Sequence, residues 1–388
     1  MKPCLIPKEK IKDKTILIRL DLNSPKIDIK HHRFISTQKT IAYLLKNKVK
    51  QIIIVAHLGR PKKDKHSFNI NNFDFYNEKL SLKLFKKPLS LLYKTKVSFI
   101  KHSLLDEKFA FSLKQNKKSK IILLENIRFY KGEEQNEVRL AKSLASFCDF
   151  FVDEAFSISH RESSSNKAIK KILPTYFGIN YLAEKENLEN IINKSKKDLT
   201  VIIGGSKIND KLAMIFKFNK KSRFILIGGA IANTLLCNMG FEIGQSLFED
   251  IPIKNINKLD FNSVIMPLDV KVLNKNNWTK NTLASEVNFD EKILDIGEFT
   301  TNTFLAKIKE SKYIFWNGPL GYIEDERFAL ATKSLLNFIK KDKKRHYIIG
   351  GGETLDCIKK FAPSIFKQKN VFVSTGGGAL LEFLSKKL

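Results

Sequence analysis

The most restrictive feature of this sequence is a repeated alternation between short apolar runs and segments with helical periodicity. Most of the apolar runs are continuous, which is typical of strands that a parallel sheet buries on both faces. The segments between them, such as 40–48, 137–147 and 211–218, carry apolar residues at helical spacing. This order predicts doubly wound α/β architecture, and its recurrence in both halves predicts two similar parallel-sheet lobes.

The predicted strands form two groups, separated by a segment without a strand pattern. In the first half they are Thr15–Leu20, Gln51–Ala56, Val97–Ile100, Lys120–Leu124 and Phe150–Val152. In the second half they are Thr200–Ile203, Phe224–Ile227, Val264–Met266, Tyr313–Trp316, His346–Ile349 and Val371–Val373. A weak helical stripe and a polar run at 180–197 predict a linking helix. We therefore expect an N-terminal domain over 1–179, a C-terminal domain over 198–388, and a cleft between the two lobes.

Composition places the chain among ordinary globular proteins. Its 388 residues predict two or three domains, and 43% hydrophobic residues exclude disorder for most of the chain. No run approaches the length of a membrane-spanning helix, and the charged start has no secretory signal. The four cysteines are far apart and form no CxxC pair, which fits a reducing compartment. We expect a cytoplasmic protein without a disulfide framework or a zinc site.

The charge balance is strongly basic, with 69 Lys and Arg against 40 Asp and Glu, a net charge of +29. Such a charge attracts polyanions, so binding to nucleic acid stands as an alternative function. Against it, the basic residues are spread along the chain, and most aromatic residues lie in apolar runs instead of among the basic ones. We expect lysines that solvate the surface, with no specific nucleic-acid partner and no membrane partner.

Arginine is scarce, since only nine of the 69 basic residues are Arg. The guanidinium binds phosphate or carboxylate through two parallel hydrogen bonds, whereas Lys offers a point charge. Several arginines follow predicted strands or stand close by, in segments that also hold polar residues, and ligands of open α/β sheets bind at such strand ends. Isolated surface salt bridges are the alternative for each. The first half thus places Asp, Asn and His side chains and four arginines, Arg33, Arg60, Arg128 and Arg161, where one anionic ligand could bind.

Glycine clusters follow the strands of the second half, at 204–205, 228–229, 350–352 and 376–378. Glycine lets the backbone approach a ligand, and N–H groups at a helix start hold phosphate. Tight turns without a ligand are the alternative. The Walker motif, the protein-kinase motifs and the dinucleotide fingerprint are all absent. An arginine-rich half and a glycine-rich half together fit phosphoryl transfer, which depends on positioning and on cationic stabilisation.

Seven segments resemble the motifs of the phosphoglycerate kinase family, and they run through nearly the whole chain. They are RLDLNSP (19–25), HLGRP (57–61), LENIRF (124–129), AFSISHR (155–161), GGSKINDK (204–211), FWNGPLG (315–321) and VSTGGGALL (373–381). The resemblance implies a monomeric glycolytic kinase that transfers the acyl phosphate of 1,3-bisphosphoglycerate reversibly to MgADP. Its products would be 3-phosphoglycerate and ATP, and hinge closure would bring the substrates together.

The resemblance also implies roles for individual positions. Phosphoglycerate would be held by Asp21, Asn23, Arg33, His57, Arg60, Arg128 and Arg161. The nucleotide would be held by Gly205, Lys211, Asn317, Glu324, Gly351, Gly352, Glu353, Thr354 and Thr375. The catalytic positions would be Arg33, Lys207, Lys211, Gly352 and Gly376, with Gly377 and Gly378 beside the last. Magnesium would be bound mostly by the nucleotide phosphates, with Glu353 as the protein's own carboxylate.

The sequence departs from the family pattern at several positions. Glu353 replaces the usual Asp, so we expect an altered dependence on magnesium. Glu154 and Ser157 replace Asp and Gly, and Ile35 replaces the second arginine near Arg33. The sequence ends eight residues after Leu380, so a shortened C-terminal strap is expected to loosen the coupling of the lobes. An inactive relative that serves as a scaffold is a third hypothesis, to which Glu353 lends some support.

Overall fold

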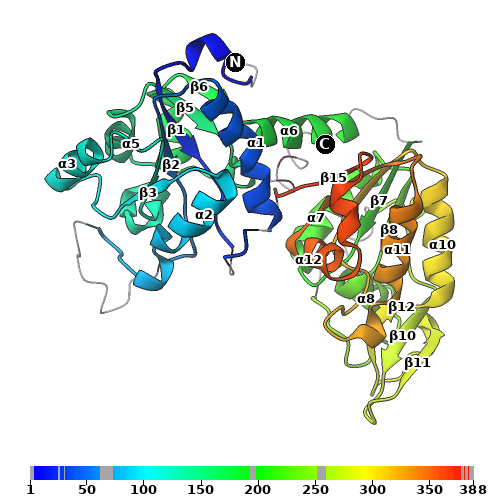
Figure 1. Cartoon of the computed structure of the whole chain (residues 1–388). Coiled ribbons are helices and arrows are strands. Elements are labelled where there is room, and N and C mark those ends of the chain that lie inside the picture. Colours follow the sequence, from blue (N-terminus) through cyan, green and yellow to red (C-terminus); the bar gives the residue numbers. More distant parts are fainter. Residues whose placement is uncertain are drawn as a thin grey trace. The chain divides into compact units, whose positions relative to one another are not determined.

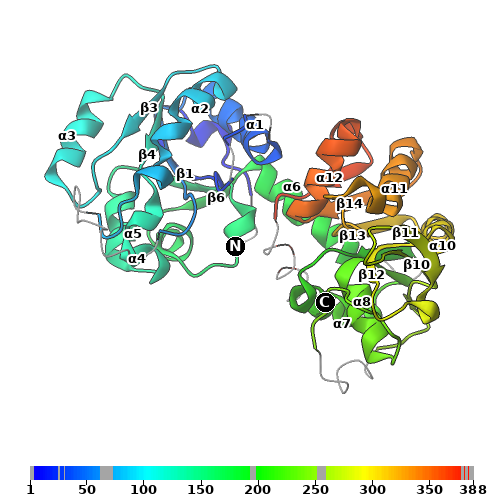
Figure 2. The same ribbon diagram turned by 90° about the horizontal axis from the view of Figure 1, so that it is seen from below.

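The computed structural model describes residues 4–24, 27–29, 31–61, 73–192, 198–250 and 259–376, together with 380 and 383. The chain divides into two compact units, Met1–Lys185 and Glu186–Leu388. Each unit contains a parallel sheet with helices (Figures 1 and 2), which confirms the predicted α/β class. Helix α6 (Ile179–Ile192) runs across the division, and residues 193–197 of the predicted linking segment are outside the described residues. The predicted domain boundaries stay a prediction.

The first unit is built on a parallel sheet of six strands in the order β3-β4-β2-β1-β5-β6. The strands are β1 (Thr15–Arg19), β2 (Gln51–Val55), β3 (Val97–Ile100), β4 (Ile121–Leu124), β5 (Phe150–Asp153) and β6 (Thr175–Phe177). The helices are α1 (His32–Lys46), α2 (Lys86–Tyr93), α3 (Glu107–Gln115), α4 (Lys131–Glu134) and α5 (Val138–Ala145). The sequence analysis predicts the first five strands and misses β6, an edge strand of three residues.

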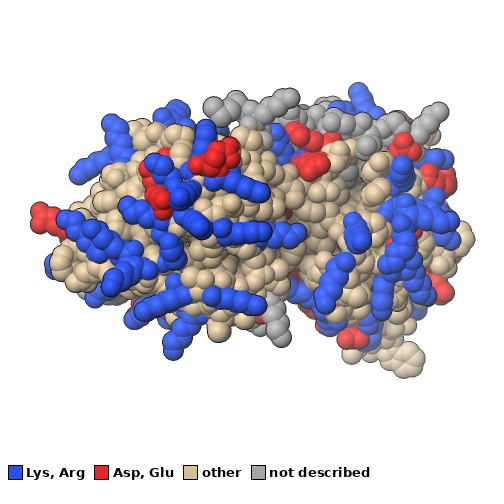
Figure 3. Space-filling view, turned by 45° about the horizontal axis from the view of Figure 1, so that its top comes forward, with Lys and Arg blue, Asp and Glu red and all other residues tan. Residues whose placement is uncertain are grey.

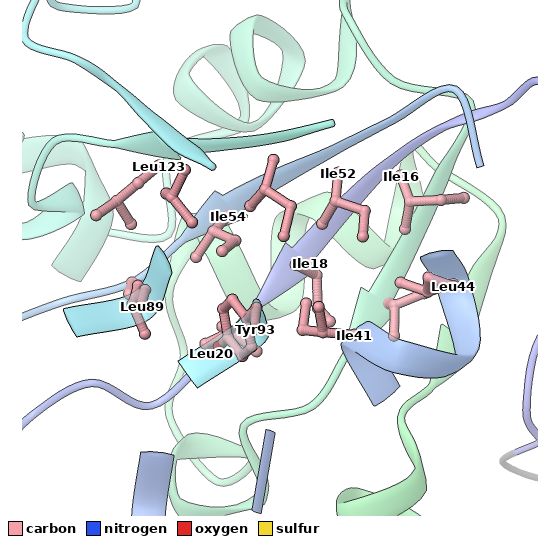
Figure 4. Close-up of a cluster of buried hydrophobic side chains, with 14 of the residues drawn as sticks. Ile16, Ile18, Leu20, Ile41, Leu44, Ile52, Ile54, Leu89, Tyr93 and Leu123 are labelled. Atoms are coloured by element: carbon pink, nitrogen blue, oxygen red, sulfur yellow. The ribbon is translucent and has the colours of Figure 1, made fainter. Parts of the chain in front are cut away.

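Both faces of this sheet are buried, which explains why its strands read as continuous apolar runs. Ile16, Ile18 and Ile52 point to the face that α1 and α2 cover (Figure 4). Leu17 and Ile53 point to the opposite face, in a second core with side chains of α3 and α5. Successive side chains of a strand alternate between faces, so a strand buried on both sides is apolar at nearly every position.

The second unit repeats this plan with the strand order β15-β14-β13-β7-β8-β9. The strands are β7 (Leu199–Ile203), β8 (Phe224–Ile227), β9 (Val264–Ile265), β13 (Tyr313–Asn317), β14 (His346–Gly350) and β15 (Val371–Val373). The helices are α7 (Ile208–Asn219), α8 (Gly229–Asn238), α10 (Glu298–Lys309), α11 (Leu330–Lys341) and α12 (Gly352–Phe361). Side chains of α10, α11 and α12 share one core with the sheet. Phe218 of α7 stacks on Phe315 of β13, with ring centroids 5.5 Å apart.

A three-stranded antiparallel sheet extends the second unit, and the sequence analysis does not predict it. Its order is β11-β10-β12, formed by β10 (Asp269–Leu273), β11 (Thr279–Leu283) and β12 (Lys292–Ile296). Strand β10 alternates between buried and half-buried residues, and β11 is largely polar. Such half-exposed strands lack the continuous apolar run that the prediction required.

Short helices complete the described chain. Those of the 3₁₀ type are Lys8–Lys10, Glu78–Leu80, Leu82–Phe85, Ile127–Phe129, Phe156–Ile158, Ile169–Lys171, Ala284–Glu286, Glu326–Phe328 and Pro363–Lys367. One π-helical turn covers Ser164–Ala168. Among the helices in the described parts of the chain, none has the length and apolar character that crossing a bilayer would require.

Candidate active site

One group of polar side chains lies at the carboxyl edge of the first sheet. The segments after β1, β2, β4 and β5 all leave the sheet there, because parallel strands end on the same side. The side-chain oxygen of Asn23 accepts the Gly59 N–H at 2.9 Å, and Arg128 donates to the Gly59 carbonyl at 2.5 Å. We call this group the anion cluster. Its members are Arg19, Asp21, Asn23, Arg33, His57, Arg60, Arg128 and Arg161.

Helix α1 brings Arg33 to this edge. The helix begins after His31, whose Nδ1 accepts the Arg33 N–H at 3.2 Å. The Arg33 guanidinium donates to the Asn23 carbonyl at 2.5 Å and lies 3.3 Å from the Asp21 carboxylate. The Ser157 hydroxyl donates to the same carboxylate at 2.5 Å. The serine that departs from the family pattern therefore helps to fix the acid that orients Arg33.

His57 is 1% exposed and is held as a neutral ring. Burial is the main cause that lowers the His57 pKa well below its usual value, followed by the charges of Arg19, Arg128, Arg161 and Arg33. An Arg19 nitrogen lies 3.1 Å from His57 Nδ1, and because a guanidinium only donates, Nδ1 accepts. The ring proton is therefore on Nε2, which has no hydrogen-bond partner among the described atoms. This N–H is suited to donate to an anionic oxygen.

Arg19 is the member of the cluster to which the sequence analysis gave no role. It is 2% exposed, and its guanidinium donates to the Ser165 hydroxyl at 2.9 Å and to the Leu20 carbonyl at 2.7 Å. Glu133 lies 4.0 Å away. A signal was present in the sequence, because a scarce arginine ends an otherwise apolar strand. A charge is retained at such a position only when partners compensate for its burial.

The anion cluster holds more positive than negative charge. The Arg128 pKa is lowered to about 10, first by burial and then by the charge of Arg161, although Glu134 lies 3.6 Å away. Arg161 is half-buried and Arg60 is exposed. Mutual repulsion among guanidinium groups is relieved when an anion binds between them. The arrangement can therefore bind a small ligand that carries several negative charges.

Glu154, the other departure next to this cluster, has a structural position. Its Oε1 accepts the Thr40 hydroxyl at 2.7 Å and the Asn180 N–H at 3.3 Å. Its Oε2 accepts the Tyr181 N–H at 3.3 Å, so the carboxylate caps the first turn of α6. Burial raises the Glu154 pKa to about 8, and its hydrogen bonds oppose this rise. The carboxylate contacts the start of α6, and the Glu154 backbone N–H donates to the carbonyl of Arg19, a member of the anion cluster, at 3.1 Å.

A second group lies at the carboxyl edge of the second sheet, where β7, β13 and β14 end in glycine-rich turns. The Gly204 N–H donates to the Asn317 carbonyl at 3.0 Å, and the Gly205 N–H donates to the Pro319 carbonyl at 2.7 Å. Gly318 has φ +99°, and a Cβ there would collide with the Gly204 carbonyl. The two turns therefore pack backbone against backbone. We call residues 204–207, 317–321 and 350–354 the glycine cluster.

Polar side chains fix the turns of this cluster by hydrogen bonds. The Thr354 hydroxyl accepts the Gly318 N–H at 2.8 Å. The Lys211 ammonium, on a side chain that is 6% exposed, donates to the Asn317 carbonyl at 3.1 Å and also to the Asn317 side-chain oxygen. Lys207 lies one turn earlier, at the exposed start of α7. The structure thus places the predicted residues Lys211, Asn317 and Thr354 next to one another.

A cavity of about 220 Å³ opens beside the glycine cluster. Gly205, Glu324 and Glu353 line it, whereas the other predicted nucleotide-binding residues do not. The sequence analysis missed much of its wall, because that wall comes from β10, β12 and the segments beside them. The missed lining residues include Leu247, Pro267, Val270, Asp295 and Tyr322.

Among these lining residues, Asp295 has a buried carboxyl group. It is 2% exposed, and it accepts the Ile296 N–H at 3.0 Å and the Ala331 N–H at 3.2 Å. Burial raises the Asp295 pKa to about 7. The remaining wall consists mostly of small residues and aliphatic side chains, which suits a flat, weakly polar ring such as a nucleobase.

The remaining predicted residues lie at the ends of β14 and β15. Gly352 is the first residue of α12, and among the described residues no atom outside its own helix and its chain neighbours stands within 4 Å of the place where its Cβ would be. Thr375 is buried, and the Gly376 N–H donates to the Ser374 hydroxyl at 3.0 Å. Gly377, Gly378 and most of the C-terminal segment for which the sequence analysis expects a shortened strap are outside the described residues.

Glu353 is the predicted magnesium ligand. Its Oε1 accepts the Ser206 hydroxyl at 3.2 Å, and its other oxygen would be 2.7 Å from a Cβ at Gly205. Within the described ranges, no group of three or more His, Cys, Asp or Glu side chains is arranged to hold a metal. A single carboxylate at a cavity rim fits magnesium that takes its other ligands from phosphates and water.

Comparisons with known proteins agree with this geometry. The family model described as "Phosphoglycerate kinase" matches residues 6–387. Phosphoglycerate kinase of Wigglesworthia glossinidia brevipalpis is 36% identical over 385 residues, which covers 97% of this chain and 92% of the relative. That of Helicobacter pylori strain ATCC 700392 / 26695 is 35% identical over 399 residues and covers 99% and 94%.

A solved structure of phosphoglycerate kinase from Coxiella burnetii has a TM-score of 0.78 and 30% identity, and covers 97% of this chain and 95% of that chain. A crystal structure from Pyrococcus horikoshii OT3, at 24% identity, has the same TM-score and supports the fold alone.

Proposed function

The chain belongs to the phosphoglycerate kinase family, and we propose how its own residues perform the reaction. The enzyme transfers the acyl phosphate of 1,3-bisphosphoglycerate reversibly to ADP, and 3-phosphoglycerate and ATP are the products. The observation that carries the assignment of its sites is the anion cluster. There, a neutral buried imidazole donor, His57, lies in the field of Arg19, Arg33, Arg128 and Arg161.

The anion cluster binds the phosphoglycerate. Arg33, Arg128 and Arg161 pair with its carboxylate and phosphate, because guanidinium groups match the geometry of both anions. His57 donates from Nε2 to one of these oxygens. Asp21 and Asn23 hold Arg33 and the Gly59 turn in position, and their remaining acceptor capacity serves the substrate hydroxyl. Exposed Arg60 closes over the ligand once it is bound.

The glycine cluster and its cavity bind the nucleotide. The base enters the largely apolar cavity, and Glu324 at its exposed rim accepts hydrogen bonds from the ribose hydroxyls. Gly205, Gly351, Gly352, Thr354 and Thr375 border the phosphates. Lys211 and Asn317 are bonded to each other beneath these turns, so they fix the floor of the phosphate site.

Phosphoryl transfer requires cationic and N–H donors on the transferring oxygens, in-line positioning and exclusion of water. Arg33, Lys207 and the N–H groups of Gly352 and Gly376 supply these donors. Lys211 joins them when its bond to Asn317 is exchanged for a phosphate oxygen. No side chain needs to take up a proton, because the acceptor is an already ionised phosphate or carboxylate.

Magnesium would accompany the nucleotide, and the Glu353 carboxylate in the cavity lining supports this part of the proposal. When bound, the ion would neutralise phosphate charge and orient the nucleotide. Glu353 would hold it, directly or through water. We also propose that the enzyme acts in the cytoplasm as a monomer in glycolysis. Its substrates are small molecules, and it has no sequence-specific nucleic-acid partner.

A coupled assay tests the proposal by following ADP formation that depends on 3-phosphoglycerate, ATP and magnesium together. The wild-type protein should turn over, and Lys207→Ala should lower kcat. Lys220→Ala, at the opposite end of the same helix, is the matched control and should retain the wild-type kcat. A folded wild-type protein without activity would establish the scaffold hypothesis instead. Equal kcat for Lys207→Ala and Lys220→Ala would refute the role of Lys207.

A further inference from the structure

The end of the second unit that lies opposite the glycine cluster is strongly basic. Four segments meet there, immediately before β8, β13, β14 and β15, and we call them together the basal face: 220–223, 309–313, 340–346 and 367–370. Twelve Lys and Arg stand in these segments against two acidic residues. Figure 3 shows how far Lys and Arg outnumber Asp and Glu on the visible surface.

The sheet register brings these segments together. Tyr313 pairs with His346 and with Leu199, and Tyr347 pairs with Val371, so the strands begin in one row. Backbone hydrogen bonds continue past the sheet, from the His346 N–H to the Lys312 carbonyl and from the Tyr347 N–H to the Asn370 carbonyl. Residues that are far apart in the sequence therefore form one continuous surface.

Two arginines make the basal face rigid. Arg345 donates to the Ile308 carbonyl at 3.0 Å and to the Lys309 carbonyl at 2.8 Å, at the end of α10. Arg223 donates to the Glu310 carbonyl at 3.0 Å. The Lys309 and Glu310 carbonyls lie at the end of α10, where a helix leaves carbonyl groups without intrahelical partners, and the Ile308 carbonyl also accepts the Ser311 N–H at 3.2 Å. The basal face is thus a fixed surface and not a set of independent loops.

Its two acids are already occupied by neighbouring groups. Glu310 pairs with Arg223 at 2.7 Å and with Lys307 at 3.1 Å. Asp342 pairs with Arg345 at 3.0 Å and accepts the Tyr347 hydroxyl at 2.5 Å. Exposed lysines, among them Lys312, Lys341, Lys344 and Lys369, form no ion pair with an acid in the described parts of the chain. Their charges face solvent.

Planar side chains lie among these charges. The rings of Tyr313 and His346 stack with centroids 5.4 Å apart and planes 18° apart. The Lys312 ammonium lies 5.9 Å from the Tyr313 ring centre. The Phe224 ring has the Lys307 ammonium 4.7 Å from its centre. The sequence argument against nucleic acid used linear order, in which rings and lysines separate, whereas the fold interleaves them on this face.

A cavity of about 220 Å³ opens at the same place. Tyr313, His346 and Phe372 supply aromatic lining, and Asn190, Asn370 and Lys369 supply amide groups and a charge. A planar heterocycle that enters it meets a ring face and hydrogen-bonding groups. Lys369 and Asn370 belong both to the cavity and to the basal face, so a ligand can use both at once.

We propose that the basal face binds single-stranded nucleic acid without sequence preference, with the backbone on its lysines and one base in the Tyr313–His346 cavity. Basic grooves with aromatic platforms bind single strands in this way. A membrane is disfavoured, because no large apolar side chain in these segments is exposed. The site is separate from the kinase chemistry, since the five-residue strand β13 puts about 15 Å between its two ends.

Fluorescence anisotropy with labelled oligothymidylate and oligouridylate of about 20 nucleotides tests this proposal, at several salt concentrations. The variant Lys312→Ala/Lys341→Ala/Lys344→Ala/Lys369→Ala removes four charges from the basal face. The matched control Lys83→Ala/Lys87→Ala/Lys108→Ala/Lys118→Ala removes four exposed charges from the first unit. The basal-face variant should lose about tenfold or more in affinity, and its salt slope should fall by about 0.7 for each lost contact. The control should change affinity less than about twofold.

The base pocket has its own test. Tyr313→Leu keeps apolar volume and removes the aromatic face, and it should weaken single-strand binding by about fivefold or more while leaving its salt slope unchanged. Duplex DNA of the same length should bind more weakly than the single strand. Kinase turnover and thermal unfolding, measured on every variant, should stay at wild-type values.

Other outcomes would overturn the proposal. Equal losses in the two quadruple variants would mean that net charge alone attracts the strand, without a site. Stronger binding to vesicles of phosphatidylserine and phosphatidylcholine than to oligonucleotides would assign the face to membranes. Unchanged affinity of Tyr313→Leu, in a variant that unfolds at the wild-type temperature, would remove the base pocket from the proposal.

Discussion

Gly352 is the residue of the glycine cluster at which a glycine needed for folding is most easily distinguished from a glycine needed for ligand binding. It begins α12 in a helical conformation and is exposed, and in the described parts of the chain no atom beyond its own helix and chain neighbours lies within 4 Å of the place where its Cβ would be. Packing therefore gives no reason for a glycine there. We attribute its small size to the phosphate that we propose binds beside it.

The substitution Gly352→Ala should accordingly raise stability and lower activity. Replacing glycine by alanine in a compatible conformation stabilises a protein by about 0.4–1 kcal/mol, mainly by restricting the unfolded chain. For a unit of this size that corresponds to a rise of about 1–4 °C in Tm. The added methyl would stand where the transferring phosphoryl approaches, and a displacement of about 1 Å there costs about 100-fold in turnover.

The control is Gly240→Ala, which should show the opposite pattern. Gly240 follows the end of α8, has φ +87° and also has open space around its missing Cβ. An alanine in that conformation costs about 1–2 kcal/mol, and kinetics should stay normal because the cavity is lined from the other end of α8. Both variants are compared by thermal unfolding, by calorimetric titration with ATP and by steady-state kinetics. Wild-type turnover in Gly352→Ala would refute the reasoning.

Three further variants test the two clusters. Arg33→Lys keeps the charge and removes the planar fork, so kcat/KM for 3-phosphoglycerate should fall by the equivalent of about 1–3 kcal/mol, and wild-type kinetics would contradict the argument from arginine scarcity. Glu353→Asp shortens the side chain that reaches Ser206, so the midpoint of the magnesium titration of turnover should move by about threefold or more, and an unmoved midpoint would count against Glu353 as a ligand. His57→Gln tests a dependence of stability on pH. The pKa of His57 is lowered in the folded state, so below pH about 6.5 the unfolded chain binds a proton at His57 that the folded chain does not. Each further pH unit therefore lowers the free energy of unfolding by about 1.4 kcal/mol, until His57 is protonated in the folded state as well. Urea unfolding should therefore show a smaller loss of stability on acidification for His57→Gln than for the wild-type protein, and identical curves would disprove the assignment.

Much of the fold could be predicted because parallel strands buried on both faces leave a direct trace in the sequence. Strands β1 to β5 and the six strands of the second parallel sheet appear as apolar runs. The antiparallel strands β10 to β12 were not predicted, because buried and exposed residues alternate in half-exposed strands and β11 is mostly polar. The wall of the cavity beside the glycine cluster was not predicted either, because Pro267, Val270 and Tyr322 carry no distinctive chemistry of their own.

The anion cluster shows the same division between prediction and structure. Arginine scarcity and strand-end position were enough to select Arg33 and Arg128, and shared motifs gave their proposed roles. Arg19 was not selected, because its importance lies in a contact with His57, 38 positions away, and in burial that a single strand does not reveal. A tautomer depends on its hydrogen-bond partner, and that partner is known only after folding.

The sequence alone determined most strands of the two parallel sheets, where their polar ends lie and which family motifs those ends carry. Those properties depend on local periodicity and on residue type, and both follow directly from the order of residues in the chain. Tertiary structure alone decided which charges are buried, which acids are already paired and which rings face the lysines of the basal face. Burial and pairing depend on residues that the sheet register brings together from distant positions, so they exist only in the folded protein.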